Sequence, residues 1–91
     1  MQFEWDPEKT VTNKANHGVS FEEATSVFGN PLATTVPDPD HSEGEERFLT
    51  TGLSSRQRVL IVWHTDRGEI IRIIGAREAT SHERRIYESG E

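Results

Sequence analysis

The chain contains no cysteine, which excludes disulfide bonds and zinc sites with thiolate ligands. Long hydrophobic runs are also missing: the longest, from Val59 to Trp63, is far shorter than the roughly 20 residues of a membrane-spanning helix. The N-terminus lacks the basic and apolar segments of a signal peptide. For 91 residues we therefore expect a single domain, residues 1–91, that is cytoplasmic and has no membrane partner.

Arginine is absent from the first half of the chain, where none occurs before Arg47. Residues 1–46 carry 2 lysines and 10 acidic residues, a net charge of −8. Residues 47–87 carry 8 arginines and 4 acidic residues, a net charge of +4, and residues 88–91 add −2, which gives the total of −6. This segregation favours a cationic face that binds a phosphate backbone, and an arginine-rich solvated surface gives the same pattern.

Two N-terminal helices are predicted. The first covers residues 7–17, with Asp6 as N-cap and Gly18 in the left-handed position after its end. Its apolar residues Val11 and Ala15, four apart, are expected to face the core. The second begins after a capping box formed by Ser20 and Glu23. Its apolar face consists of Phe21, Ala24, Val27 and Phe28.

Strand patterns and one further helix complete the predicted fold. A third helix runs from Thr80, which forms a capping box with Glu83, through Tyr87. Five segments favour strands: residues 2–5, 32–36, 47–52, 58–65 and 69–76. The predicted class is α+β: a small, mostly antiparallel sheet with two N-terminal helices packed on one face and a C-terminal helix, in the order β-α-α-β-β-β-β-α.

Several segments resemble one known family. The run NHGVSFEEA, from Asn16 to Ala24, is similar to a characteristic segment of the BrnT toxins. The segments 38–48, 71–80 and 83–88 also resemble that family, in the same order along the chain. The resemblance implies a RelE-like fold and a ribonuclease that arrests translation. It also implies neutralisation by a BrnA-like antitoxin, through which the toxin would contact operator DNA only indirectly.

RNA cleavage without a metal needs a base, an acid and cations that stabilise charge on the phosphate. Arg72 interrupts an isoleucine-rich strand, where a permanent charge is costly unless it has a function or an ion-pair partner such as Glu46 or Glu69. His64 suits proton transfer because the unperturbed pKa of histidine is near 6.5, and a strand-end structural role is the alternative.

Hairpin geometry relates these two residues. If residues 66–68 form a three-residue loop, Val62 pairs with Arg72. His64 and Arg72 then project from one sheet face, opposite the two N-terminal helices. A two-residue turn of Arg67 and Gly68 would shift the register and separate them.

The expected site therefore has two groups of residues. The catalytic residues are expected to be His64, Arg72 and Arg77. The substrate-binding residues are expected to be Arg47, Arg84, Arg85 and Tyr87, and for Tyr87 packing is the alternative.

The remaining patterns point to other classes of protein. Asp38, Asp40 and His41 have side chains that can bind a metal, but two prolines stiffen their loop and no second ligand cluster occurs, so neither a metal nor another cofactor is expected. A non-catalytic module whose arginines dock a partner is the main alternative to a ribonuclease. A DNA-binding accessory is disfavoured because the chain lacks helix-turn-helix signals.

Overall fold

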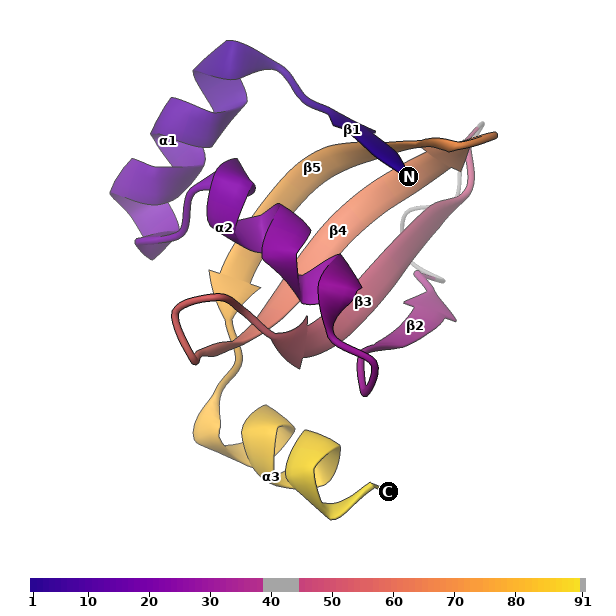
Figure 1. The fold of residues 1–91 in the computed structure, drawn as a ribbon. Helices are drawn as coiled ribbons and strands as arrows, with labels where there is room; N and C mark the ends of the chain where they lie inside the picture. The colour runs from indigo at the N-terminus through magenta and orange to yellow at the C-terminus, as the bar shows by residue number, and fades with distance from the viewer. Residues whose placement is uncertain (39–44, 91) are drawn as a thin grey trace.

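The computed structural model describes residues 1–38 and 45–90. The described chain forms β1 (Gln2–Glu4), α1 (Pro7–His17), α2 (Phe21–Ser26), the 3-10 helix η1 (Val27–Gly29), β2 (Thr34–Pro37), β3 (Arg47–Leu53), β4 (Val59–Arg67), β5 (Ile70–Glu78) and α3 (Ser81–Ser89) (Figure 1). The predicted α+β class and order of elements are confirmed. Asp40 and His41, considered as metal ligands, lie outside the described residues.

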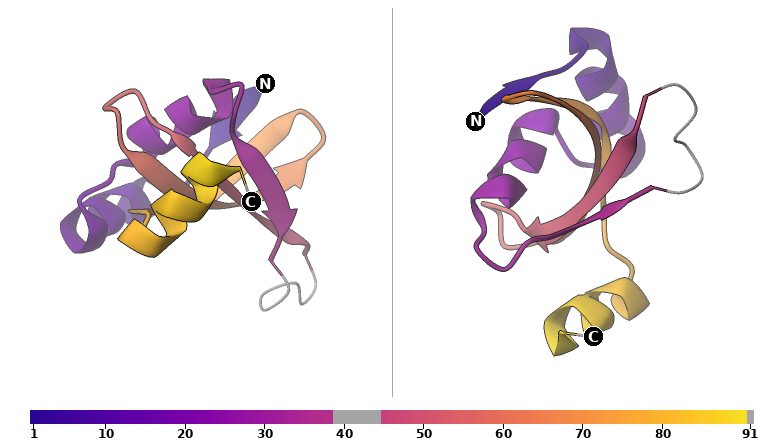
Figure 2. Two further views of the ribbon diagram at one scale, coloured as in Figure 1. Left: turned by 90° about the horizontal axis from the view of Figure 1, so that it is seen from below. Right: turned by 90° about the vertical axis from the view of Figure 1, so that its right-hand side faces the viewer.

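The five strands form one sheet in the order β1-β5-β4-β3-β2. Strand β1 runs parallel to β5 and every other neighbouring pair is antiparallel, so the sheet is mixed. The sheet curves around α2, and α3 lies apart from the other helices at one end (Figure 2). We call the face covered by α2 and η1 the inner face and the opposite one the outer face.

The main core lies on the inner face, where the second helical segment packs on the two central strands. Because side chains alternate along a strand, every second residue of β4 and β5 points to this side. Gly52 on β3 permits a close approach, since a Cβ atom there would lie 2.9 Å from Val27 Cγ1 and from Ala33 Cβ. The fully buried apolar residues are Val19, Phe21, Ala24, Val27, Leu60, Val62, Ile73 and Ala76.

Helix α1 contributes no buried residue to this core. Val11 is 70% exposed and Ala15 is also exposed, so the prediction that they face the core is wrong. The helix is held by polar groups instead. Asn13 binds the backbone of β5, donating to Ala76 O at 2.8 Å and accepting from Ala76 N at 3.2 Å. Thr10 Oγ1 accepts a hydrogen bond from the backbone N–H of Phe21 at 3.0 Å.

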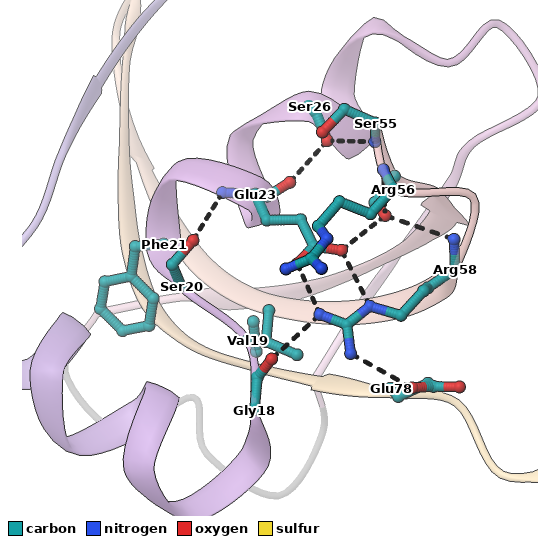
Figure 3. A network of polar contacts seen from close by, with 12 residues as sticks. Gly18, Val19, Ser20, Phe21, Glu23, Ser26, Ser55, Arg56, Arg58 and Glu78 are labelled. Carbon is teal, nitrogen blue, oxygen red and sulfur yellow. Dashed lines mark hydrogen bonds and ion pairs between the residues drawn. The ribbon is translucent and has the colours of Figure 1, made fainter.

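A buried ion pair fixes α2 to the turn between β3 and β4 (Figure 3). The carboxylate of Glu23, whose side chain is 5% exposed, accepts bonds from two guanidinium nitrogens of Arg58 and from Ser54 Oγ at 2.7 Å. Arg58 also donates to Gly18 O at 3.0 Å. Hydrogen bonds from Arg58 are the main cause that lowers the pKa of Glu23. Only the Ser20 half of the predicted capping box forms, because the Glu23 side chain turns to Arg58.

The outer face is covered at one end only. Val59 and Ile61 of β4 are buried there with Ala79, and Tyr87 of α3 packs against them. Helix α3 begins with the predicted capping box of Thr80 and Glu83. The other end of the outer face is not covered by a helix. None of the described helices is long and apolar enough to cross a membrane.

Candidate nucleic-acid interface

The turn between β4 and β5 differs from the predicted one. Arg67 pairs with Ile70, which leaves Gly68 and Glu69 as a two-residue turn in place of the predicted three-residue loop over residues 66–68. Gly68 has a φ of +64°, which glycine adopts at less cost than residues with a side chain. A different loop length changes the register of the whole hairpin.

The new register separates two predicted site residues. Arg72 pairs with Thr65 and Ile73 pairs with His64, and a bulge follows between His64 and Trp63, which pairs with Gly75. Directly paired residues share a face and adjacent residues alternate, so Arg72 lies on the outer face and His64 on the inner face. The prediction that His64 and Arg72 share one face is therefore wrong.

His64 is part of the inner-face core, where it is 1% exposed. Its ring packs edge-on against Phe28, with the ring centroids 5.0 Å apart. Its Nδ1 lies 2.7 Å from Asp66 Oδ1 and its Nε2 lies 2.7 Å from Thr50 Oγ1, which in turn lies 2.8 Å from Thr35 Oγ1. In a neutral ring Nδ1–H donates to Asp66 and Nε2 accepts from Thr50. The sheet separates this imidazole from any phosphate on the outer face.

The outer face carries a line of polar residues across four strands. Glu4 of β1 pairs with Arg72 of β5, Arg72 with Thr65 of β4, and Thr65 with Arg47 of β3. We call these four residues the polar row. Arg72 Nη1 lies 3.6 Å from Glu4 Oε1, and both side chains are more than a third exposed. Thr65 Oγ1, between the two arginines, is buried and has no hydrogen-bond partner within the described residues.

An aromatic side chain lies next to the polar row. Trp63, half-buried on the outer face, pairs with Leu49 on one side and Gly75 on the other. Gly75 leaves room for the indole, since a Cβ atom there would lie 3.8 Å from Trp63 Cε3. Arg77 Cζ lies 5.4 Å from the centre of the Trp63 ring. An aromatic ring flanked by guanidinium groups on an open sheet face is the arrangement that binds single-stranded nucleic acid.

Arg77 is on the outer face, but a carboxylate holds its guanidinium. Glu83 accepts two hydrogen bonds from Arg77, at 2.8 and 2.9 Å. These bonds are the main cause that lowers the pKa of Glu83 to about 2. At about 3.3 Å per residue, Arg72 and Arg77 are roughly 16 Å apart along β5. The two predicted catalytic arginines therefore cannot hold the same phosphate, although both can contact one RNA strand.

The predicted substrate-binding residues of α3 are only partly at this face. Tyr87 is half-buried and lines a groove of about 300 Å³ between α3 and the sheet, together with Thr34, Ile61 and Ile86. Its hydroxyl accepts a weak bond from Asn30 Nδ2 at 3.5 Å. Arg84 and Arg85 are exposed on α3 and do not line this groove.

Two residues of this surface, Glu4 and Trp63, were not predicted from the sequence. The signal for Trp63 was available, because an aromatic residue two positions before Thr65 has to share its face. Glu4 carried no such signal, since its place depends on β1 lying parallel to β5. Within the described residues, no group of three histidine, aspartate or glutamate side chains could hold a metal ion.

The profile of a family described as ribonuclease toxin, BrnT, of type II toxin–antitoxin systems matches residues 5–83. Among solved structures, the fold resembles the crystal structure of the Brucella abortus ribonuclease toxin BrnT, with a TM-score of 0.69 and 24% sequence identity over 89% of this chain and 99% of that chain. No curated protein sequence matches the chain.

Proposed function

Because the chain belongs to the BrnT family of ribonuclease toxins, we propose that it is an endoribonuclease that cleaves RNA without a metal and arrests translation. Type II systems pair such a toxin with an antitoxin, and a BrnA-like protein is the proposed partner of this chain. Operator DNA would then be contacted through the antitoxin.

The polar row is the observation that carries this proposal. Arg47 and Arg72 flank the buried hydroxyl of Thr65 on a sheet face that α3 leaves open. Guanidinium groups bind phosphate oxygens in a planar, two-pronged geometry, and they stabilise the charge that develops on phosphorus during cleavage. Trp63 lies beside the row, where a nucleobase can stack on its indole. Arg77 and Tyr87 extend the same face toward α3.

His64 has a different place in this proposal. It keeps a structural role on the inner face, where Asp66 and Thr50 satisfy both ring nitrogens. The proton transfers of RNA cleavage are therefore assigned to groups on the outer face, where the polar row lies.

The decisive experiment measures cleavage of a defined RNA by the purified chain in the presence of EDTA. Wild type should cleave, and Arg72→Ala should reduce the rate about 10²- to 10³-fold, the usual effect of removing one preorganised charge contact. Arg56→Ala is the matched control, because Arg56 is exposed in the turn between β3 and β4. Its rate should stay at the wild-type level.

Two further measurements separate catalysis from folding and from docking. Thermal melting should place Arg72→Ala within about 0.5 kcal/mol of wild type, since exposed ion pairs contribute little. If folded wild type leaves RNA intact but still binds an antitoxin encoded beside it, the chain is the interaction module considered above, and the ribonuclease proposal fails.

A further inference from the structure

We propose that Glu4 is the general base of the RNA cleavage, removing the proton of the 2′-hydroxyl next to a phosphate held by Arg72. This inference rests on the proposed ribonuclease function and assigns the step that His64 cannot perform. Glu4 comes from the N-terminal strand, far in sequence from the arginines it joins. The parallel pairing of β1 with β5 places it beside Arg72 at one end of the polar row.

A carboxylate that acts as a general base needs an oxygen within hydrogen-bond reach of the substrate hydroxyl. Among the described residues, three carboxylates approach the arginines that β4 and β5 place on the outer face, and two of them are held by paired hydrogen bonds. Glu83 accepts two bonds from Arg77, and Glu45 accepts two from Arg67 at 2.8 and 3.0 Å. Each is therefore committed to its own arginine.

Glu4 differs from both of these carboxylates. Its side chain is 40% exposed, and the arginine contacts of its Oε1 are long: 3.6 Å to Arg72 Nη1 and 3.9 Å to Arg67 Nη1. Neither contact is a hydrogen bond by distance. The carboxylate is held near the row by charge while its lone pairs remain available to a substrate hydroxyl.

The spacing of the row fits one ribose–phosphate unit. Neighbouring strands are about 4.8 Å apart, so a phosphate placed over Arg72 and Thr65 leaves the adjacent ribose within reach of Glu4. Thr65 Oγ1 has no partner within the described residues and can donate to a phosphate oxygen if neighbouring side chains part. Arg47 closes the other end of the row and can contact the same or the next phosphate.

The chemical step is an intramolecular transesterification at phosphorus. The 2′-hydroxyl gives its proton to a Glu4 carboxylate oxygen, and the 2′-oxygen attacks phosphorus while Arg72 stabilises the added charge. The bond from phosphorus to the 5′-oxygen breaks, and a water molecule protonates the leaving oxygen. Glu4 then releases its proton to solvent. The products are a 2′,3′-cyclic phosphate and a 5′-hydroxyl.

The test is Glu4→Gln, which keeps the size of the side chain and its ability to accept a hydrogen bond but removes the base. The rate of RNA cleavage should fall about 10²-fold or more, in the range of general-base catalysis. Affinity for the same RNA with 2′-O-methyl groups, which cannot be cleaved, should stay within about threefold or increase. Glu69→Gln, an equal change of charge at the exposed β4–β5 turn, should leave the rate unchanged.

A pH profile distinguishes a base from a residue that only positions Arg72. Wild type and Glu4→Asp should both lose activity toward acid pH with a slope of one, whereas the residual activity of Glu4→Gln should lack that slope. The groups facing Glu4 are Arg67 and Arg72, with Glu45 on the far side of Arg67. The control Glu69→Gln should keep the wild-type profile.

Two results would overturn the assignment. Cleavage by Glu4→Gln within about twofold of wild type would leave the ribonuclease proposal standing and remove Glu4 from it. A wild-type chain that binds the 2′-O-methyl RNA but never cleaves natural RNA would remove both.

Discussion

Two glutamate–arginine pairs in this molecule use the same chemistry in opposite surroundings. Glu23 and Arg58 form a closed pair on the inner side, where the carboxylate is 5% exposed and accepts hydrogen bonds from Arg58 and Ser54. Glu4 and Arg72 form an open pair on the outer face, 3.6 Å apart and exposed on both sides. The carboxylate of the closed pair is shielded from a ligand by burial and its hydrogen bonds, whereas the open pair has exposed donors and acceptors.

This difference shows how the charges segregated along the sequence are paired in the folded protein. The acidic N-terminal half supplies Glu4, Glu23 and Glu45, and the arginine-rich half supplies a partner to each. Most of the arginines noted in the sequence therefore have a carboxylate partner in the folded protein. Ligand binding is expected where arginine donors are not fully taken up by carboxylates, and the polar row is such a place.

Truncation of the two glutamates should give the largest difference between the closed and the open pair. Among the described residues, Glu23→Ala leaves Arg58 only the long carboxylate contact to Glu78 and removes the acceptor for the buried Ser54 hydroxyl. It should reduce the free energy of unfolding by about 3 kcal/mol, because removing one partner of a buried pair leaves the other charge poorly compensated. The melting temperature of a domain this size should then fall by about 12–24 °C. Glu4→Ala should change the free energy of unfolding by no more than about 0.5 kcal/mol.

Calorimetry or thermal circular dichroism of both variants provides the measurement. Equal losses of stability in Glu23→Ala and Glu4→Ala would mean that the open pair is also structural, and its availability to a ligand would then be in doubt.

The two tryptophans allow a second test, with a smaller expected effect, of which face of the sheet binds RNA. Trp5 packs on Phe21 at 6.1 Å between ring centroids on the inner side, whereas Trp63 lies beside the polar row. In a Trp5→Phe protein, 2′-O-methyl RNA should quench the fluorescence of Trp63. Trp63→Leu should weaken binding of that RNA about tenfold, since stacking contributes about 1–3 kcal/mol per base.

Trp63→Phe serves as the control, because it retains an aromatic face and should bind more tightly than Trp63→Leu. Quenching of Trp5 in the Trp63→Phe protein, together with no quenching of Trp63 in the Trp5→Phe protein, would place the RNA on the inner face and contradict the proposal.

Acid should produce the smallest effect and should act on the tightly held carboxylates. The folded state lowers the pKa of Glu83 to about 2 and also lowers that of Glu23, in both cases chiefly through hydrogen bonds from arginine. Stability from these groups is therefore fully present above about pH 4.5 and is lost as the pH falls toward 2. For Glu83, which is 32% exposed, solvent screening reduces the contribution to about 1 kcal/mol.

Urea unfolding between pH 6 and pH 3 measures this loss. Wild type should lose more stability over that interval than Glu83→Gln does, and a parallel loss in the two proteins would show that the Arg77 pair is not a source of acid sensitivity.

Local signals in the sequence predicted most of the fold. Asp6, Ser20 and Thr80 cap the three helices as expected, because a cap depends only on residues within one turn. The apolar face of Phe21, Ala24 and Val27 was also predicted correctly, since the helical period specifies it. The same reasoning failed for Val11, because polar contacts of Asn13 and Thr10 set the orientation of α1.

The site was less predictable because it depends on register between strands. One residue in the length of the β4–β5 turn decides whether His64 and Arg72 share a face, and composition allowed either turn. The bulge at residues 63–64 and the parallel placement of β1 are tertiary features without a local pattern. Sequence could therefore name Arg47 and Arg72 as candidates but could not join them to Glu4.

The amide of Asn13 has a consequence for the width of the sheet. By donating to and accepting from one residue of β5, it occupies the position that a neighbouring strand would otherwise take beyond the end of β1. At the opposite border, Pro37 has no N–H to offer to an incoming strand. Strand addition is thus blocked along the part of β5 beyond β1 and weakened at Pro37 on β2, which favours the faces of the sheet over these two stretches as the place for a partner.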